Sequence, residues 1–158
     1  MDDLVKFDSL KIIIQIIGKM YDLVRIIDPS KKTIVLFSQE GENKLNFTNA
    51  ACYSMWHKGK ACENCISTRA LNENKAMVKI EYDQGRVFLI NAFPVEVQGE
   101  KIVVEMFKDI TENGIIDIKA DTNDAGEIER VINRRNRAIV EDDLTRVYNK
   151  RYIYERLP

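Results

Sequence analysis

The sequence contains few of the residues that mark fibrous, linker-dominated or membrane-spanning chains. Seven Gly and three Pro among 158 residues exclude a collagen-like or linker-dominated protein. The longest apolar block, residues 12–17, is broken by Gln15 and is far shorter than the roughly 20 apolar residues that cross a bilayer. The N-terminus is acidic and has no signal-peptide pattern. We therefore expect a cytoplasmic protein without a membrane span.

The chain also lacks an excess of charge of either sign. It carries 24 Lys and Arg against 25 Asp and Glu, which gives a formal net charge of −1. A nucleic-acid-binding domain usually shows a basic excess, so we expect no nucleic acid as a partner. The apolar content of 45% argues against wholesale disorder, and the length fits one ordinary domain.

The first segment of the chain, residues 1–20, is expected to form a helix over 4–20. Apolar residues recur there at helical spacing, and further Ile residues extend the apolar face almost all the way round. These residues are Leu10, Ile12, Ile13, Ile14, Ile16 and Ile17. Such a helix needs a cover, which is either the rest of the domain or a second copy of the chain. A homodimer is therefore one expectation.

The hydrophobic pattern then changes to that of strands and turns. Two strands joined by turn residues predict a hairpin, a polar loop and two short helices over 48–57 and 65–72 follow, and three further strands form a meander. The strands are expected over 23–27, 33–37, 77–82, 86–97 and 101–107. This order predicts an α+β fold with a five-stranded antiparallel sheet, helices on one face, and a small ligand cavity under the helical insert.

The order of elements resembles the PAS sensory domain over about residues 8–112, with the domain proper over 21–112. Asp109-Ile110-Thr111 looks like the Asp-Ile-Thr that ends many PAS domains, where the Asp and the Thr join the last strand to the outgoing helix. Short polar side chains suit that place because they bond nearby backbone groups. The resemblance implies a PAS-like sheet between an N-terminal helix and a C-terminal linker helix. It also implies a sensor of ligand, redox state or light that acts on an attached output domain.

The linker, residues 113–141, is expected to begin as a loop and to become helical from Glu127. Its stripe residues are spaced 4, 3 and 4 apart, which is the rhythm of a coiled coil. They are Ile128, Ile132, Arg135 and Ile139. A stripe of two turns that contains an Arg would not hold two helices together alone. We expect it to couple two subunits whose ends are fixed elsewhere, so that a change of register is transmitted.

The last segment, 142–158, carries a second resemblance. Its sequence Asp-Asp-Leu-Thr-Arg-Val-Tyr-Asn-Lys-Arg resembles the opening signature of GGDEF domains, the diguanylate cyclases, which is Asp-x-Leu-Thr-Gly-Leu-x-Asn-Arg-Arg. The matching positions are Asp142, Leu144, Thr145, Asn149 and Arg151, whereas Arg146, Val147 and Lys150 differ. In the family this segment packs the linker onto the domain, and its Asp and Arg pair with each other.

The catalytic motif of that family, Gly-Gly-Asp-Glu-Phe or Gly-Gly-Glu-Glu-Phe, does not occur in the sequence. We therefore expect no cyclic di-GMP synthesis and no catalytic residues in this chain. The resemblance implies a piece of a longer diguanylate cyclase, whose C-terminal GGDEF domain is the partner of this one.

All three Cys and the only His and Trp lie within 14 residues. The candidate sensing residues are Cys52, Trp56, His57, Cys62 and Cys65. Two thiolates three residues apart can bind one soft metal ion, and Cys52 and His57 could complete the ligand set. Three Cys and one His suit zinc, and three thiolates with another ligand suit an iron–sulfur cluster. The pattern resembles a cysteine-containing variant of PAS domains found in anaerobic bacterial sensors.

Several other interpretations of these residues stay open. Cys62 and Cys65 precede a predicted helix, whose N-terminus, with Lys58 and Lys60, would lower a thiol pKa and favour a reversible disulfide or a small thiol redox protein. His57 could bind haem, and the cavity could take a flavin or another small molecule. The cysteines and the Trp could instead be inert packing in a ligand-free dimerisation scaffold. A cavity lined only by apolar side chains would favour the scaffold.

Overall fold

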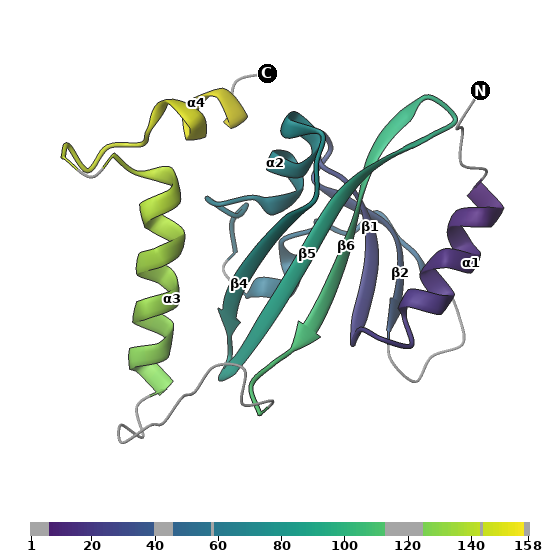
Figure 1. The fold of residues 1–158 in the computed structure, drawn as a ribbon, viewed down its shortest axis with the longest axis horizontal. Helices are drawn as coiled ribbons and strands as arrows, with labels where there is room; N and C mark the ends of the chain where they lie inside the picture. The colour runs from purple at the N-terminus through teal and green to yellow at the C-terminus, as the bar shows by residue number, and fades with distance from the viewer. Residues whose placement is uncertain (1–6, 40–45, 58, 113–124, 143, 157–158) are drawn as a thin grey trace.

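The structure is a computed structural model that describes residues 7–39, 46–57, 59–112, 125–142 and 144–156. The predicted polar loop before residue 46 and the predicted loop over 113–124 lie outside the described residues. Figure 1 shows the described elements. In chain order they are α1 (Phe7–Ile17), β1 (Leu23–Asp28), β2 (Thr33–Gln39), β3 (Asn46–Phe47), the 3-10 turn η1 (Ser54–Trp56), α2 (Ile66–Glu73), β4 (Met77–Asp83), β5 (Arg86–Val97), β6 (Glu100–Asp109), α3 (Ala125–Val140) and α4 (Lys150–Arg156).

The strands form one antiparallel sheet in the order β3-β2-β1-β6-β5-β4. The predicted α+β class and all five predicted strands are confirmed, and the arrangement is compatible with a PAS-like fold. The two-residue strand β3, which pairs with β2, was not expected from the polar sequence around it.

Helices cover both faces of the sheet, so the expectation of helices on one face is wrong. Leu10 and Ile14 of α1 are buried on one face against side chains of β1, β2 and β6. Ile66 and Ala70 of α2 are buried on the other face against β5 and β6. The central strands are apolar on both faces, and each buried Leu or Ile side chain stabilises the fold by roughly 1.5–3 kcal/mol, so both faces need a cover.

The helix predicted over 48–57 is reduced to the single 3-10 turn η1. The backbone before this turn pairs with the edge of the sheet instead. The Ile34 N–H donates to the Ala50 carbonyl at 2.9 Å, and the Cys52 N–H donates to the Lys32 carbonyl at 2.9 Å. Backbone groups engaged in this way cannot make helical hydrogen bonds.

Two predictions about residues that form a turn or mark the edge of a strand are confirmed. Gln84 and Gly85 both have positive φ, at 47° and 83°, as the two-residue turn between β4 and β5 requires. Pro94 lies two residues beyond Ala92, the last β5 residue that pairs with β4, and from there on β6 is the one described strand that pairs with β5. The missing N–H of the proline therefore lies on a local sheet edge.

The Asp109-Ile110-Thr111 tripeptide closes the sheet by local polar contacts. The Thr111 N–H donates to Asp109 Oδ1 at 3.0 Å, and the Val87 N–H donates to Thr111 Oγ1 at 2.9 Å. Ile110 is buried together with Val87 of β5 and Ile132 of α3. The tripeptide thus fastens the end of β6 to β5 and offers an apolar contact to α3.

Figure 1 places α1 at the β1–β2 end of the sheet and α3 beside the opposite edge strand, β4. The α4 helix follows α3 and lies near α2. None of the described helices is long and apolar enough to cross a membrane.

Candidate functional site: a cysteine pocket between helix α2 and the C-terminal helix

The cysteine segment, residues 52–65, lies on the same face of the sheet as α2. A buried cation on β1 anchors its first part. Arg25, which is 3% exposed, donates from Nη1 to the Cys52 carbonyl at 2.8 Å and contacts Met55 Sδ at 2.9 Å. Its Nε donates to Glu105 of β6 at 2.7 Å, and Ser67 of α2 bonds the other oxygen of that carboxylate. The segment and α2 are therefore held through one buried ion pair.

A second buried cation anchors the end of the cysteine segment. Lys79 of the edge strand β4 donates from Nζ to the Asn64 carbonyl at 2.9 Å. The same Nζ lies 2.6 Å from Glu81, and both side chains are almost fully buried. Because a buried charge must be paired, each cation that holds the segment has its own carboxylate.

The three thiols lie at the wall of one pocket. Cys52, Cys62 and Cys65 form no disulfide with one another, and together they line an open pocket of about 520 Å³. The same three residues line a second, interior cavity of about 20 Å³ against the sheet. The cysteines therefore separate the interior from the outer pocket, which we call the cysteine pocket. Its other walls include polar side chains of α2, of α4 and of the loops that precede β2 and η1, among them Lys32, Tyr53, Thr68, Asn72, Tyr154 and Glu155.

Burial keeps two of the thiols protonated. Burial raises the pKa of Cys52 to about 12, and it also raises the pKa of Cys62, which the charge of Lys79 only partly offsets. The expectation that Lys58 and Lys60 would lower a thiol pKa is therefore wrong for Cys62: Lys60 is exposed, and Lys58 lies outside the described residues. The cost of placing a thiolate in an apolar environment exceeds the attraction of the nearest cation.

Cys65 lies where the sequence placed it, at the start of a helix. It is the N-cap residue of α2, with extended backbone angles. Its Sγ accepts a hydrogen bond from the Thr68 hydroxyl at 3.2 Å, and the Arg69 N–H donates to its carbonyl. The side chain is part-buried at the pocket wall.

Trp56 lines the interior cavity together with the thiols, whereas His57 lies apart from them. Trp56 is 5% exposed and packs edge-on against Phe88, with ring centroids 6.1 Å apart, and against Phe107 at 5.7 Å. His57 is exposed, and its Nδ1 lies 3.1 Å from Asp83 at the end of β4. Trp56 is therefore a core residue, and His57 belongs to a surface pair.

The expected ligand sets for zinc or an iron–sulfur cluster are not preformed. Within the described residues, no three Cys, His, Asp or Glu side chains lie close enough together to hold one metal ion. His57 pairs with Asp83, which removes the fourth ligand from the expected set. The structure therefore places His57 apart from the three thiols, and a metal at Cys52, His57, Cys62 and Cys65 stays a prediction.

The interior cavity is too small for haem or flavin. Its volume of about 20 Å³ has room for about one water molecule. The small ligand cavity that was predicted under the helical insert is filled by the side chains of Trp56, Phe88 and Phe107. Among the cavities that all three thiols line, a ligand of more than a few atoms has room in the cysteine pocket and not in the interior cavity.

The linker stripe packs inside the chain. Ile132 is buried in a cluster with Val87 and Ile110, and Ile128 packs against the same cluster. Arg135 is exposed and Ile139 is half-buried. Two of the four stripe residues are therefore used to seat α3 on the sheet, and pairing with a second linker helix stays a prediction.

The residues of the second signature build the turn between α3 and α4. The Asp142 carboxylate accepts hydrogen bonds from the Leu144 N–H, the Thr145 N–H and the Thr145 hydroxyl at 2.9–3.1 Å, and these bonds lower its pKa. Asn149 donates to the Ile139 carbonyl at 2.9 Å and accepts from the Tyr152 N–H at 3.0 Å. The first residue of the signature shapes the turn, and the Asn fastens the start of α4 to the end of α3.

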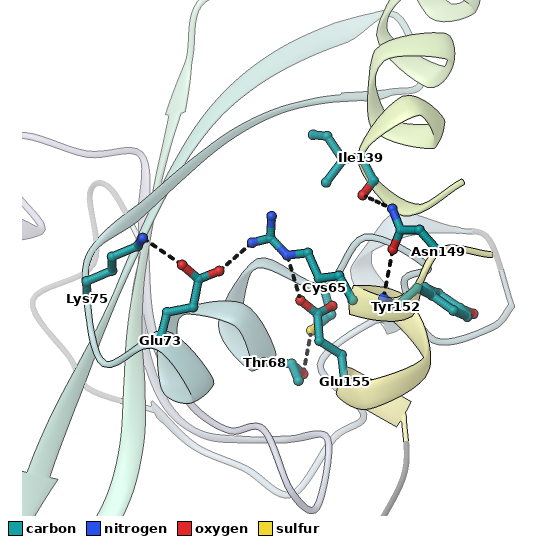
Figure 2. Close-up of polar contacts among 9 residues, drawn as sticks. Cys65, Thr68, Glu73, Lys75, Ile139, Asn149, Tyr152 and Glu155 are labelled. Atoms are coloured by element: carbon teal, nitrogen blue, oxygen red, sulfur yellow. Dashed lines mark hydrogen bonds and ion pairs between the residues drawn. The ribbon is translucent and has the colours of Figure 1, made fainter. Parts of the chain in front are cut away.

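Arg151 does not pair with Asp142, so that expectation is wrong. Its Nη2 donates to Glu73 of α2 at 2.5 Å, and its Nε donates to Glu155 at 3.2 Å, one turn further along α4. Figure 2 shows this bridge, with Glu155 near Cys65 and Thr68. The signature Arg thus docks α4 onto α2 at the rim of the cysteine pocket.

The anchoring residues of the cysteine segment were missed in the sequence. Arg25, Lys79, Glu81 and Glu105 each interrupt an apolar strand at a position that faces α2. A charged residue in the inward register of a strand is a usable signal, since such a residue needs a buried partner. The identity of each partner depends on strand pairing: Arg25 lies directly opposite Glu105 in the β1–β6 ladder.

A scan against protein-family models finds no family that matches this chain, and a search of the curated proteins finds no relative. The resemblances to the PAS and GGDEF families rest on the residues described above.

Proposed function

We propose that this chain is the sensory part of a cytoplasmic signalling protein, in which events in the cysteine pocket control a C-terminal GGDEF domain. The observation that carries the proposal is the lining of the pocket. Three thiols of the cysteine segment and Tyr154 and Glu155 of α4 line the same space. An occupant or a modification there acts directly on the helix that begins the output segment.

The signal that the pocket detects is a species that reacts with its thiols. Cys52 and Cys62 are held protonated by burial, and a thiol, unlike a thiolate, is a weak nucleophile. Weak electrophiles therefore react slowly, whereas a strong oxidant or a thiophilic species that enters the pocket can react. Since α4 forms part of the wall, the docking of α4 also governs access to the thiols. Synthesis of cyclic di-GMP belongs to the output domain and not to this chain.

A small thiol redox protein is the second candidate, because Cys65 caps α2 beside an open pocket. The raised pKa of Cys62 disfavours it, since catalytic pairs of this kind need a stable thiolate. A ligand-free scaffold is disfavoured by the convergence of charged and polar side chains on the pocket.

The test uses the longer protein that carries the GGDEF domain. Cyclic di-GMP synthesis from GTP is measured after equilibration in reducing and in oxidising buffer, for the wild type, for Cys62→Ser and for the control Ser54→Ala, an exposed residue of the same segment. We expect the wild type and the control to change rate between the buffers and Cys62→Ser not to change. Equal rates for all three proteins in both buffers would contradict the proposal. Reduction of a disulfide substrate by the 158-residue chain would favour the second candidate.

A further inference from the structure

A side-chain contact joins the cysteine segment to the linker helix. Asn64, which lies between Cys62 and Cys65, donates from Nδ2 to Asn136 Oδ1 of α3 at 3.1 Å. Asn136 in turn donates from its own Nδ2 to the Ile80 carbonyl of β4 at 3.2 Å. The residue between the two neighbouring thiols is therefore bonded to the helix that leads to the output segment.

We infer that the Asn64–Asn136 pair is the contact through which a change at Cys62 or Cys65 alters the packing of α3 on the sheet. This inference rests on the proposed function. Asn136 is in this sense a positioning residue: it touches no thiol, and it acts through Asn64.

The orientation of both amides is determined by the network. Both polar atoms of Asn136 are in use, one as a donor to Ile80 and one as an acceptor from Asn64. Turning the Asn64 amide over would bring two oxygen atoms together, so its Nδ2 must face Asn136. This leaves Asn64 Oδ1 buried without a hydrogen-bond partner among the described residues, although Asn64 is only 4% exposed.

The unpaired oxygen makes the docked arrangement responsive. A buried acceptor without a donor is unfavourable, and it regains a hydrogen bond as soon as Asn64 turns towards water. Space for this movement lies next to the pair. A pocket of about 220 Å³ separates α3 from the cysteine segment, and Asn64, Asn136 and Cys62 all line it. A small displacement of residues 62–65 is therefore enough to exchange the Asn136 contact for hydration.

The C-terminal half of α3 is held by this contact and by Val140, which is buried at the same pocket. Ile128 and Ile132 seat the first half on the apolar cluster at Val87 and Ile110. Residues 137 and 138, directly after Asn136, are exposed. Loss of the Asn64–Asn136 pair thus leaves Val140 as the buried contact of the part of α3 that continues into the turn at Asp142, so this part loosens while the first half stays in place.

The experiment measures the coupling in both directions on the 158-residue chain. The first measurement is the rate of alkylation of each cysteine by iodoacetamide, resolved by site with mass spectrometry. In Asn136→Ala we expect Cys62 to react at least about five-fold faster, the lower end of typical couplings between sites. Cys52, which is anchored by Arg25, serves as the internal reference and should not change. The matched control is Asn133→Ala, one turn earlier on α3 at the same pocket, which should leave all rates unchanged.

The second measurement is hydrogen exchange of the α3 amides after alkylation of Cys62. We expect faster exchange over residues 133–140 in the alkylated wild type, and no further increase on alkylation of Asn136→Ala, because its contact is already lost. A purely structural role of Asn136 would give additive effects, and additivity would overturn the inference, as would unchanged Cys62 reactivity. If Asn136→Ala does not fold, Asn136→Leu keeps the branched shape of the side chain and removes the hydrogen bonds, and the same outcomes apply.

The outcomes separate this inference from the proposed function. If synthesis of cyclic di-GMP depends on Cys62 while α3 exchange does not, the sensor stands and this coupling is wrong. If alkylation and α3 are coupled while synthesis ignores Cys62, the coupling stands and the proposed output is wrong.

Discussion

At the scale of single residues, two buried cations decide where the thiols lie. Arg25 and Lys79 each combine a carboxylate partner with a hydrogen bond to a backbone carbonyl of the cysteine segment. A buried ion pair by itself is weak evidence for stability, because desolvation of both charges offsets their attraction. Removing one partner is different, since it leaves a buried charge unpaired.

The first prediction concerns that unpaired charge. Glu105→Ala leaves Arg25 buried without its carboxylate and removes the bond to Ser67, so we expect a loss of about 3–5 kcal/mol in the free energy of unfolding. Urea denaturation followed by circular dichroism measures this loss. The control Glu96→Ala changes an exposed carboxylate on β5 and should stay within about 0.5 kcal/mol of the wild type. A loss for Glu105→Ala no larger than that of the control would contradict the anchoring role.

The second prediction concerns the Cys52 thiol and pH. Its pKa of about 12 in the folded chain exceeds the ordinary thiol value of 9.0. The unfolded chain therefore loses this proton first as the pH rises, which favours unfolding. The wild type should lose stability from about pH 9 towards pH 12, and none of this loss should occur below about pH 9.

Cys52→Ala supplies the comparison for that effect. Urea midpoints of the two chains are measured between pH 7 and 10.5, and only their difference is used, because Lys and Tyr side chains titrate in both. We expect the wild type to decline more steeply than Cys52→Ala above pH 9. Parallel curves would show that the thiol is not buried in solution.

At the scale of elements, the residues of the second signature hold α3, the turn and α4 together, but not through the Asp–Arg pair that the family resemblance implied. Asp142 and Thr145 shape the turn, and Asn149 joins the two helices. These contacts are local, since they join residues at most ten positions apart. The partner of Arg151 is Glu73, 78 residues away, and no local pattern could have revealed it.

The third prediction tests the docking of α4. Arg151→Ala removes the bridge between Glu73 and Glu155, and since Arg151 is 43% exposed we expect a modest effect of about 0.2–1 kcal/mol. Hydrogen exchange of the α4 amides should become faster, and Cys65 at the pocket rim should become more accessible to a thiol reagent. Lys150→Ala, a neighbouring exposed cation, is the control and should change neither. If the α4 amides of Arg151→Ala exchange as slowly as those of the wild type, other contacts dock the helix.

At the scale of the whole molecule, the N-terminal helix leaves an apolar surface open. Ile12, Ile13, Ile16 and Met20 are 43–67% exposed. With 100° between successive helical residues, Ile12 and Ile16 lie on the side of α1 opposite Leu10 and Ile14, which are buried against the sheet, Ile13 lies beside them, and Met20 follows in the turn after the helix. A helix that is apolar on both sides has used one side for its own domain, and we propose that a second copy of the chain covers the other.

The fourth prediction tests this dimer. Ile12→Glu combined with Ile16→Glu places two charges on the open side of α1, so we expect the wild type to sediment as a dimer at micromolar concentration and the double variant as a monomer. Lys19→Glu, an exposed change near the end of the helix, should leave the dimer intact. A wild-type chain that is monomeric at all concentrations would contradict the assignment of this surface.

The sequence by itself determined the α+β class, the positions of the five long strands, the strand-ending tripeptide and the grouping of the thiols. Each of these depends on residue spacing or on hydrogen bonds between near neighbours, as with Gly85 in its turn and Pro94 at its edge. Only the tertiary structure decided that helices cover both faces, that His57 turns to Asp83, and that Asn64 meets Asn136 at a separation of 72 residues. Such contacts depend on strand register and helix packing across the whole chain, which no local pattern encodes.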